Sequence, residues 1–294
     1  MTILVTGATG QLGRLVVEAL LEKAVPADQI VAGGRNPAKL AELAALGVQT
    51  RSIDYSDPAS LREAFTGVHK VLLVSGNIPG SRVSLHLNVI EAAKDAGVEL
   101  LAYTSIPNAD SSTMALAVDH QDTERALNNS GLPVALLRNG WYLENYTDQL
   151  AGYLQHGSVF GSAAEGALNG ATRADLAQAA AAVLLADDQG GTIHELGGSD
   201  SFTLADLAQE VTAATGQSVT YQDLPEEDFS HVLIGAGVPE AFARILADSD
   251  RGIARGDLLV QGNALETLLG RPATTLREAV QASASVAAVT QPAS

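Results

Sequence analysis

The chain has 294 residues, of which 46% are hydrophobic and 17% charged, and its formal net charge is −17. This length and composition are typical of a globular protein with a large core, and the acidic balance argues against nucleic acid or an anionic membrane surface as a partner. Because the sequence contains no cysteine, disulfides, thiolate metal sites and cysteine nucleophiles are excluded.

No basic leader precedes the first apolar strand, and no apolar run approaches the length of a bilayer. We therefore expect a cytoplasmic protein without a membrane span. The six histidines have no paired spacing and no accompanying acidic cluster, so we expect no metal site. The oligomeric state is left open, with a homodimer as one option.

The first strand, residues 2–6, is followed at once by a glycine-rich turn and a helix. Three glycines are spaced three residues apart in this turn, an arrangement that presents a helix N-terminus to a pyrophosphate. A turn that binds no ligand is the alternative. The residues expected to hold the pyrophosphate are Gly7, Thr9, Gly10, Gln11, Leu12 and Gly13.

The second strand, residues 30–34, ends in two glycines and is followed by Arg35. In a dinucleotide fold an acidic residue at this strand end binds the ribose hydroxyl of NAD, whereas a guanidinium suits the 2′-phosphate of NADP. Lys39 lies one turn into the next helix. We therefore predict NADPH rather than NADH, unless Arg35 is only a solvated loop residue.

Polar residues also follow the next three strands. Asp54 comes after residues 49–53 and is either an acceptor for the adenine amino group or a plain turn residue. The strand at 70–74 ends in Ser75, Gly76 and Asn77, and the strand at 100–104 ends in Ser105. Strands and helices alternate regularly here, which predicts a doubly wound parallel sheet with one groove along its carboxyl edge.

A sixth strand at 133–137 leads into a stretch that holds the only tryptophan. We add Asn139 to the expected cofactor-binding residues. Aromatic residues at a strand end suggest a site for a flat apolar ligand, so Trp141, Tyr142, Asn145 and, from the earlier loop, Asn77 are the substrate candidates. The alternative is that Trp141 and Tyr142 are apolar plugs between two lobes.

Three residues are candidates for catalysis. His120 lies near the start of a helix expected from about residue 119 to 129, and a histidine can supply or relay a proton near neutral pH. A neutral structural histidine is an equally open interpretation. Tyr142 and Ser105 are further hydroxyl candidates.

After residue 145 the regular alternation of strands and helices fades. We expect residues 1–145 to form the dinucleotide-binding domain, with 172–198 returning to it. Residues 146–171 and 199–284 are expected to form a smaller, mostly helical lobe on the substrate side, and 285–294 a flexible tail.

The sequence resembles the NmrA-like group of atypical short-chain dehydrogenase/reductases, within it the branch of bacterial NAD(P)H:quinone oxidoreductases and triphenylmethane reductases. The stretches that carry the resemblance are Val5–Gly13, Arg35–Lys39, Asp54–Tyr55, Ala102–Ser105, Arg138–Asn145, Thr172–Ala177 and Ala247–Asp250. The resemblance implies a Rossmann-like domain, NADPH as cofactor and reduction of quinones or other planar conjugated compounds.

One departure concerns the proton donor. Most members of the wider superfamily use a Tyr-x-x-x-Lys pair, and no tyrosine here has a lysine at that spacing. A quinone needs little acid help, because its reduced oxygen is already a fairly stable phenolate-like group. The alternatives are an NADP(H)-sensing regulator without turnover and a reductase of a bulky ketone, imine or triarylmethane dye. The physiological substrate stays open.

Overall fold

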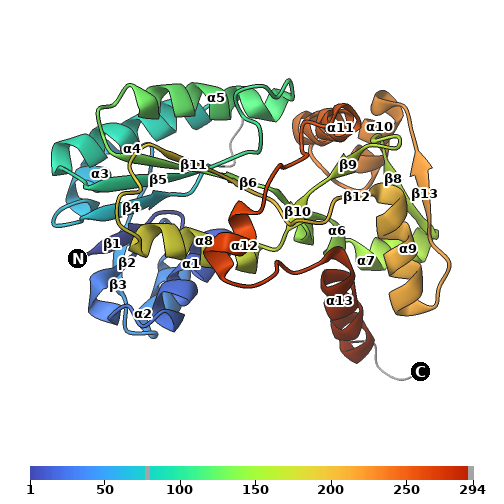
Figure 1. The fold of residues 1–294 in the computed structure, drawn as a ribbon, viewed down its shortest axis with the longest axis horizontal. Helices are drawn as coiled ribbons and strands as arrows, with labels where there is room; N and C mark the ends of the chain where they lie inside the picture. The colour runs from blue at the N-terminus through green and yellow to red at the C-terminus, as the bar shows by residue number, and fades with distance from the viewer. Residues whose placement is uncertain (77–79, 291–294) are drawn as a thin grey trace.

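The computed structural model describes residues 1–76 and 80–290. Its centre is a seven-stranded sheet in the order β11-β6-β5-β4-β1-β2-β3, and all neighbouring strands are parallel (Figure 1). The strands are β1 (Ile3–Val5), β2 (Ile30–Gly34), β3 (Gln49–Ser52), β4 (Lys70–Leu73), β5 (Leu100–Ser105), β6 (Val134–Asn139) and β11 (Thr192–Leu196).

Helices cover both faces of this sheet. Alternate residues of a strand point to opposite faces, so Ile3 and Val5 pack in the core with α1 and α8, whereas Leu4 packs with α3 and α4. The predicted Rossmann-like doubly wound fold is thereby confirmed. The helices are α1 (Gln11–Glu22), α2 (Pro37–Ala44), α3 (Pro58–Ala64), α4 (Arg82–Ala96), α5 (Ala115–Asn128), α8 (Arg173–Leu185) and α12 (Ala264–Leu269), with a 3-10 turn, η1 (Ala27–Gln29).

The strand order reverses at β1. Leu4 of β1 pairs with Val31 of β2 on one side and with Val71 of β4 on the other. From β1 the chain first adds β2 and β3 on one side, and it later adds β4 and the strands after it on the other side. The loops after β1 and β4 therefore lead to opposite faces of the sheet. Such a switch point leaves a crevice at the carboxyl ends of the strands, where ligands bind in open α/β sheets.

A smaller, mostly helical lobe follows the sheet along the chain and lies on the right in Figure 1. Its own core contains, among others, Tyr146, Phe202, Leu207 and Ile253. The lobe elements are β7 (Trp141–Tyr142), α6 (Glu144–Thr147), α7 (Leu150–His156), β8 (Ser158–Gly161), β9 (Ala167–Leu168), β10 (Gly170–Ala171), β12 (Phe202–Thr203), α9 (Leu204–Thr215), β13 (Thr220–Asp223), α10 (Glu226–Gly235), α11 (Glu240–Arg255) and α13 (Leu276–Thr290).

Three two-stranded ribbons join these elements: β7 with β10, β8 with β13, and β9 with β12. Most of these strands have only two residues, which is too short for alternation of apolar and polar residues to be read from the sequence.

The chain crosses between the two parts more than once. After the first lobe segment, α8 packs against α1, and β11 then pairs with β6 as an edge strand of the large sheet. The division of the chain at residues 145, 172 and 198 stays a prediction. Helix α13 extends to Thr290 and so includes residues 285–290 of the expected flexible tail, whose flexibility stays a prediction; residues 291–294 lie outside the described residues. None of the described helices is both long and apolar enough to cross a bilayer.

Candidate cofactor and active site

The glycine turn lies between the end of β1 and the start of α1. Gly7 has a φ of 60°, a conformation that favours glycine, and its carbonyl accepts the N–H of Gly10 at 2.9 Å. A Cβ on Gly13 would collide with the backbone of Gly7 and Ala8. Only glycine therefore allows α1 to begin this close to the turn.

The N-terminus of α1 is open to a ligand. Its N-cap residue is Gly10, which provides no side-chain cap, and the first turn contains no acidic residue. Among the predicted residues of this turn, Gln11 is exposed, while the side chain of Leu12 is buried in the core. Backbone N–H groups and the helix dipole are thus what this turn offers to an anion.

Three predicted residues, Thr9, Arg35 and Lys39, meet beside the turn. Thr9, Arg35, Asn36, Pro37 and Lys39 line one open groove, and Arg35 and Lys39 are both exposed. The side chain of Asn36 caps α2 by accepting the N–H of Lys39. The groove offers two cations next to an uncapped helix N-terminus, which fits a dinucleotide that carries a phosphate on its ribose.

Asp54 follows β3 and is half-buried. Its Oδ1 accepts hydrogen bonds from the backbone N–H of Ser56 at 2.9 Å and from its hydroxyl at 2.7 Å, and these two bonds lower the pKa of the carboxyl. One carboxylate oxygen is therefore used by the turn. The adjacent Tyr55 donates its phenolic O–H to the carbonyl of Val74, so this loop also supports the end of β4.

At the end of β4, the backbone of Gly76 is held on both sides by buried residues of α4. Its N–H donates to Nε2 of His86 at 3.0 Å, and its carbonyl accepts from Nε of Arg82 at 2.6 Å. The N–H of Ser75 donates to Oγ1 of Thr104 at 2.8 Å. Asn77, the third residue predicted for this loop, lies outside the described residues.

Ser105 ends β5 and its hydroxyl is already engaged. It donates to Oε1 of Glu124 at 2.5 Å, and both carboxylate oxygens of Glu124 accept from the Arg138 guanidinium, at 3.1 and 2.8 Å. All three side chains are buried. Ser105 is therefore part of a buried polar network, which limits its value as a proton donor.

His120 lies on the same face of α5 as Glu124 and is 5% exposed. Its Nδ1 shares a hydrogen bond of 2.8 Å with the phenol of Tyr103, a residue with no exposed surface. Burial, and then the nearby Arg82 charge, lower the pKa of His120 well below its ordinary value. The ring is neutral at physiological pH, so it has no imidazolium proton to give.

Asn139 is the last residue of β6 and is buried at the carboxyl edge. Its Oδ1 has no hydrogen-bond partner in the part of the chain that the structure describes. A buried amide oxygen without a donor is costly, so this atom fits a hydrogen-bond donor brought by a ligand. With the glycine turn and the Arg35 groove, it gives a third point at which the residues present fit NADPH.

The two aromatic residues of β7 face different cores. Trp141 packs against the lobe core, and Tyr142 packs against the core that contains α1 and α8, as adjacent strand residues must. They do not form one continuous aromatic wall. The guanidinium of Arg173 lies 4.5 Å from the Tyr142 ring centroid and donates to Oδ1 of Asn145 at 3.1 Å.

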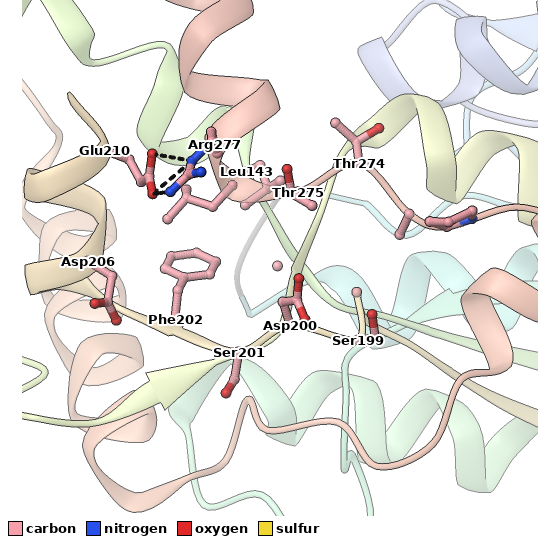
Figure 2. Close-up of a pocket in the computed structure, with 15 residues that line it drawn as sticks. Leu143, Ser199, Asp200, Ser201, Phe202, Asp206, Glu210, Thr274, Thr275 and Arg277 are labelled. Carbon is pink, nitrogen blue, oxygen red and sulfur yellow. Dashed lines mark hydrogen bonds and ion pairs between the residues drawn. The ribbon is translucent and has the colours of Figure 1, made fainter. Parts of the chain in front are cut away.

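A cavity of about 510 Å³ lies between the loop after β11 and the starts of α9 and α13. Figure 2 shows the ring of Phe202 and the side chain of Leu143 near Thr275 and Asp200, with Arg277 paired to Glu210. Of the predicted site residues that the structure describes, none lines this cavity. Across the described ranges, no three or more His, Asp or Glu side chains are placed to hold a metal ion.

The sequence interpretation missed several residues that shape this edge. Arg82 and His86 are four residues apart on α4, a spacing that places both on one helix face, but nothing in the sequence indicated that they meet Gly76. Glu124 and Arg138 were likewise given no role. Arg173 was given no role in the site either, and it contacts both Tyr142 and Asn145.

Comparison with known proteins agrees with this geometry. The model of a family described as NAD(P)H-binding matches residues 7–187. Quinone oxidoreductase 2 of Escherichia coli is 49% identical over 278 residues, which cover 95% of this chain and 97% of that protein.

Two solved structures are also similar. The NADPH-dependent quinone oxidoreductase of Escherichia coli in complex with NADPH has a TM-score of 0.92 and 48% identity, covering 96% of this chain and 99% of that one. The triphenylmethane reductase of Citrobacter sp. in complex with NADP(H) has a TM-score of 0.91 and 38% identity, covering 96% and 100%. Both likenesses extend over the sheet and the lobe.

Proposed function

The chain belongs to the NAD(P)H-binding, NmrA-like family, and on that premise we propose that it is an NADPH-dependent reductase that transfers hydride to a quinone or similar planar conjugated acceptor. The observation that carries the proposal is the uncapped start of α1 beside the groove of Thr9, Arg35 and Lys39. The similarity to the Escherichia coli quinone oxidoreductase supports the choice of acceptor.

The start of α1, the adjacent groove and the carboxyl edge of the sheet each bind a different part of the cofactor in this proposal. The backbone N–H groups at the start of α1 bind the pyrophosphate, and Arg35 with Lys39 binds the 2′-phosphate. Bound NADPH supplies the hydride, and the protein orients it. Ser75, Gly76 and Asn139 lie at the carboxyl edge, where they border the nicotinamide half.

The residues near this edge are better suited to orienting groups than to giving protons. Ser105 donates to Glu124, and His120 is neutral and bonded to Tyr103. An acceptor that forms a stable phenolate-like oxygen suits such a site, because it needs no strong general acid. This favours a quinone over a simple ketone.

The test is NADPH oxidation by the purified protein, followed through the absorbance of the reduced nicotinamide. We expect turnover with 1,4-benzoquinone and 1,4-naphthoquinone, and a much higher KM when NADH replaces NADPH. Tight NADPH binding without turnover on any acceptor would contradict the proposal and favour an NADP(H)-sensing regulator.

A second candidate acceptor is a triarylmethane dye, because the chain is 38% identical to the Citrobacter triphenylmethane reductase over nearly its whole length. The same assay with such a dye, measured by its loss of colour, distinguishes the two. We expect kcat/KM to be higher for quinones, and the reverse order would make the dye class the better description.

We also propose that the enzyme is cytoplasmic and acts on a small molecule, and we leave a homodimer as a prediction. Cell fractionation tests the cytoplasmic location, and light scattering of the purified protein tests the homodimer. Neither result bears on the acceptor.

A further inference from the structure

The segment 106–114 follows Ser105 from the large sheet but packs with the lobe. Ile106, Ala109 and Met114 belong to the lobe core, together with Ile253 of α11. A Cβ on Gly252 of α11 would collide with the Met114 side chain. This segment therefore fits closely between the carboxyl edge of β5 and the lobe helix α11.

Asn108 is at the centre of this segment. Its amide Nδ2 donates to two carbonyls of the chain that leaves α11, that of Asp257 at 3.1 Å and that of Leu259 at 2.7 Å. Its backbone φ is 51°, in the left-handed region that asparagine tolerates better than most residues. The side chain is thus directed at lobe backbone by a conformation that few residues adopt.

The backbone of Asn108 is bound to the sheet instead. Its N–H lies 3.1 and 3.3 Å from the two carboxylate oxygens of Glu195 on β11. Nη1 of Arg138 donates to the same carboxylate at 2.9 Å and to Asp110 at 3.1 Å. Nε and Nη2 of this buried guanidinium bind Glu124, which accepts from Ser105. One residue therefore joins the network at the ends of β5 and β6 to the lobe.

The chain bound by Asn108 is also held from its other side. Asn169 accepts the N–H of Val260 through Oδ1 at 2.9 Å, and its own N–H donates to the carbonyl of Leu258 at 3.1 Å. Residues 257–260 thus each have one backbone group bound by an asparagine. Asn108 binds the carbonyls of 257 and 259 from the sheet side, and Asn169 binds the carbonyl of 258 and the N–H of 260 from the lobe side. This connection carries the chain from α11 to α12.

A further contact joins the same two parts. α5 begins at Ala115, and its N-cap Met114 makes no side-chain cap. Oδ2 of Asp248, on α11, accepts the N–H of Ala115 at 2.6 Å, so a lobe residue satisfies one of the free donors at this helix start. Because of this second link, the lobe stays attached to the sheet when the side-chain bonds of Asn108 are removed, so the effect of Asn108 alone can be measured.

We propose that Asn108 is a positioning residue that fixes the lobe against the carboxyl edge of the sheet and thereby sets how tightly the acceptor is held. The inference rests on the proposed reductase function. Within the part of the chain that the structure describes, Asn108 makes no hydrogen bond to the glycine turn or the Arg35 groove. Its side chain binds the 257–259 backbone, its N–H binds Glu195, and its carbonyl accepts only from Ser111 and Ser112 of its own segment. Its loss should weaken acceptor binding and leave NADPH binding intact.

The test uses Asn108→Gly, which keeps the left-handed backbone and removes both side-chain bonds to 257 and 259. Asp188→Gly is the matched control, because Asp188 has a φ of 54°, is exposed and lies in the loop before β11. Asn108→Asp is a second variant, because it tolerates the same φ but places a carboxylate against two carbonyls. For each protein we would measure the KM for 1,4-benzoquinone, the Kd for NADPH by fluorescence and hydrogen exchange of residues 256–262.

We expect Asn108→Gly to raise the quinone KM about tenfold, to change the NADPH Kd less than about twofold, and to speed exchange of residues 256–262 about tenfold. Asn108→Asp should have the larger effect and Asp188→Gly none. Parallel rises in KM and Kd, or faster exchange with an unchanged KM, would overturn the inference. If the wild type reduces no acceptor, the reductase function fails, while the exchange data still decide whether Asn108 holds the lobe.

Discussion

Nε2 of His86 accepts the backbone N–H of Gly76 at 3.0 Å, and this bond decides which ring nitrogen carries a proton. A backbone N–H can only donate, so the proton of the neutral ring is on Nδ1, which lies 3.0 Å from Oγ1 of Thr123. With Arg82 bound to the Gly76 carbonyl, α4 holds both backbone polar groups of Gly76, which follows β4.

The first prediction concerns this contact. His86→Phe keeps a planar ring but removes the acceptor for Gly76 and the donor to Thr123. We expect a loss of about 2–3 kcal/mol in the free energy of unfolding, measured by urea titration, and weaker NADPH binding. His231→Phe, at an exposed position of α10, is the control and should change neither quantity. Unchanged stability in His86→Phe would mean that the clamp on Gly76 is unimportant.

The second prediction is the pH dependence of the same residue. Burial, and then the Arg82 charge, lower the pKa of His86 to about 3, against an ordinary value of 6.5. Between these values the unfolded chain binds the proton and the folded chain does not, so stability falls as the pH drops below about 6.5 and is unaffected above it. The advantage of wild type over His86→Phe should therefore shrink by about 2 kcal/mol from pH 7.5 to pH 5. An equal difference at both pH values would show that His86 is not kept neutral.

The third prediction concerns Asp250 on α11, which is 8% exposed. Its Oδ2 accepts the N–H of Ser162 at 2.8 Å, but burial raises the pKa of the carboxyl to about 7. Here the folded chain binds the extra proton between about pH 4 and 7, so this residue costs stability as the pH rises through that window. Asp250→Asn keeps an acceptor for Ser162 and stays neutral.

Relative to wild type, Asp250→Asn should therefore be about 2–4 kcal/mol more stable at pH 8 than at pH 4. Urea titrations at the two pH values measure this difference directly. Asp187→Asn, an exposed aspartate in the loop after α8, should show no such pH-dependent gain. A constant difference between wild type and Asp250→Asn would indicate that Asp250 ionises normally.

Structural features that depend on residues close together in the sequence could be predicted. The alternation of apolar strands and helices indicated the doubly wound sheet, and a strand followed by Gly7, Gly10 and Gly13 indicated an open helix start. Arg35 and Lys39 were expected to act together, and they line one groove with Thr9. In each case the residues that meet are neighbours along the chain or lie at the ends of adjacent strands.

Features that depend on the rotation of one element against another could not be predicted. His86 contacts Gly76 only because α4 turns that face toward β4, and Asn108 reaches Leu259 across 151 residues. Trp141 and Tyr142 were expected to be substrate residues or apolar plugs between two lobes; they pack against two different cores, and their contact with a substrate stays a prediction. Neither periodicity nor composition shows how α4 is rotated against β4 or which distant segments meet.

The fourth prediction tests the preference for NADPH at Arg35. This residue is exposed in the groove with Lys39, and in our proposal it binds the 2′-phosphate of NADPH. Hydrogen bonds to a charged partner contribute about 1.5–3 kcal/mol each, so Arg35→Ala should raise the KM for NADPH about 10- to 100-fold. NADH lacks this phosphate, and its KM should change less than about twofold. Arg62→Ala, at an exposed position of α3, controls for the loss of one positive charge from an acidic protein. Equal effects of Arg35→Ala on both cofactors would remove the basis for NADPH preference.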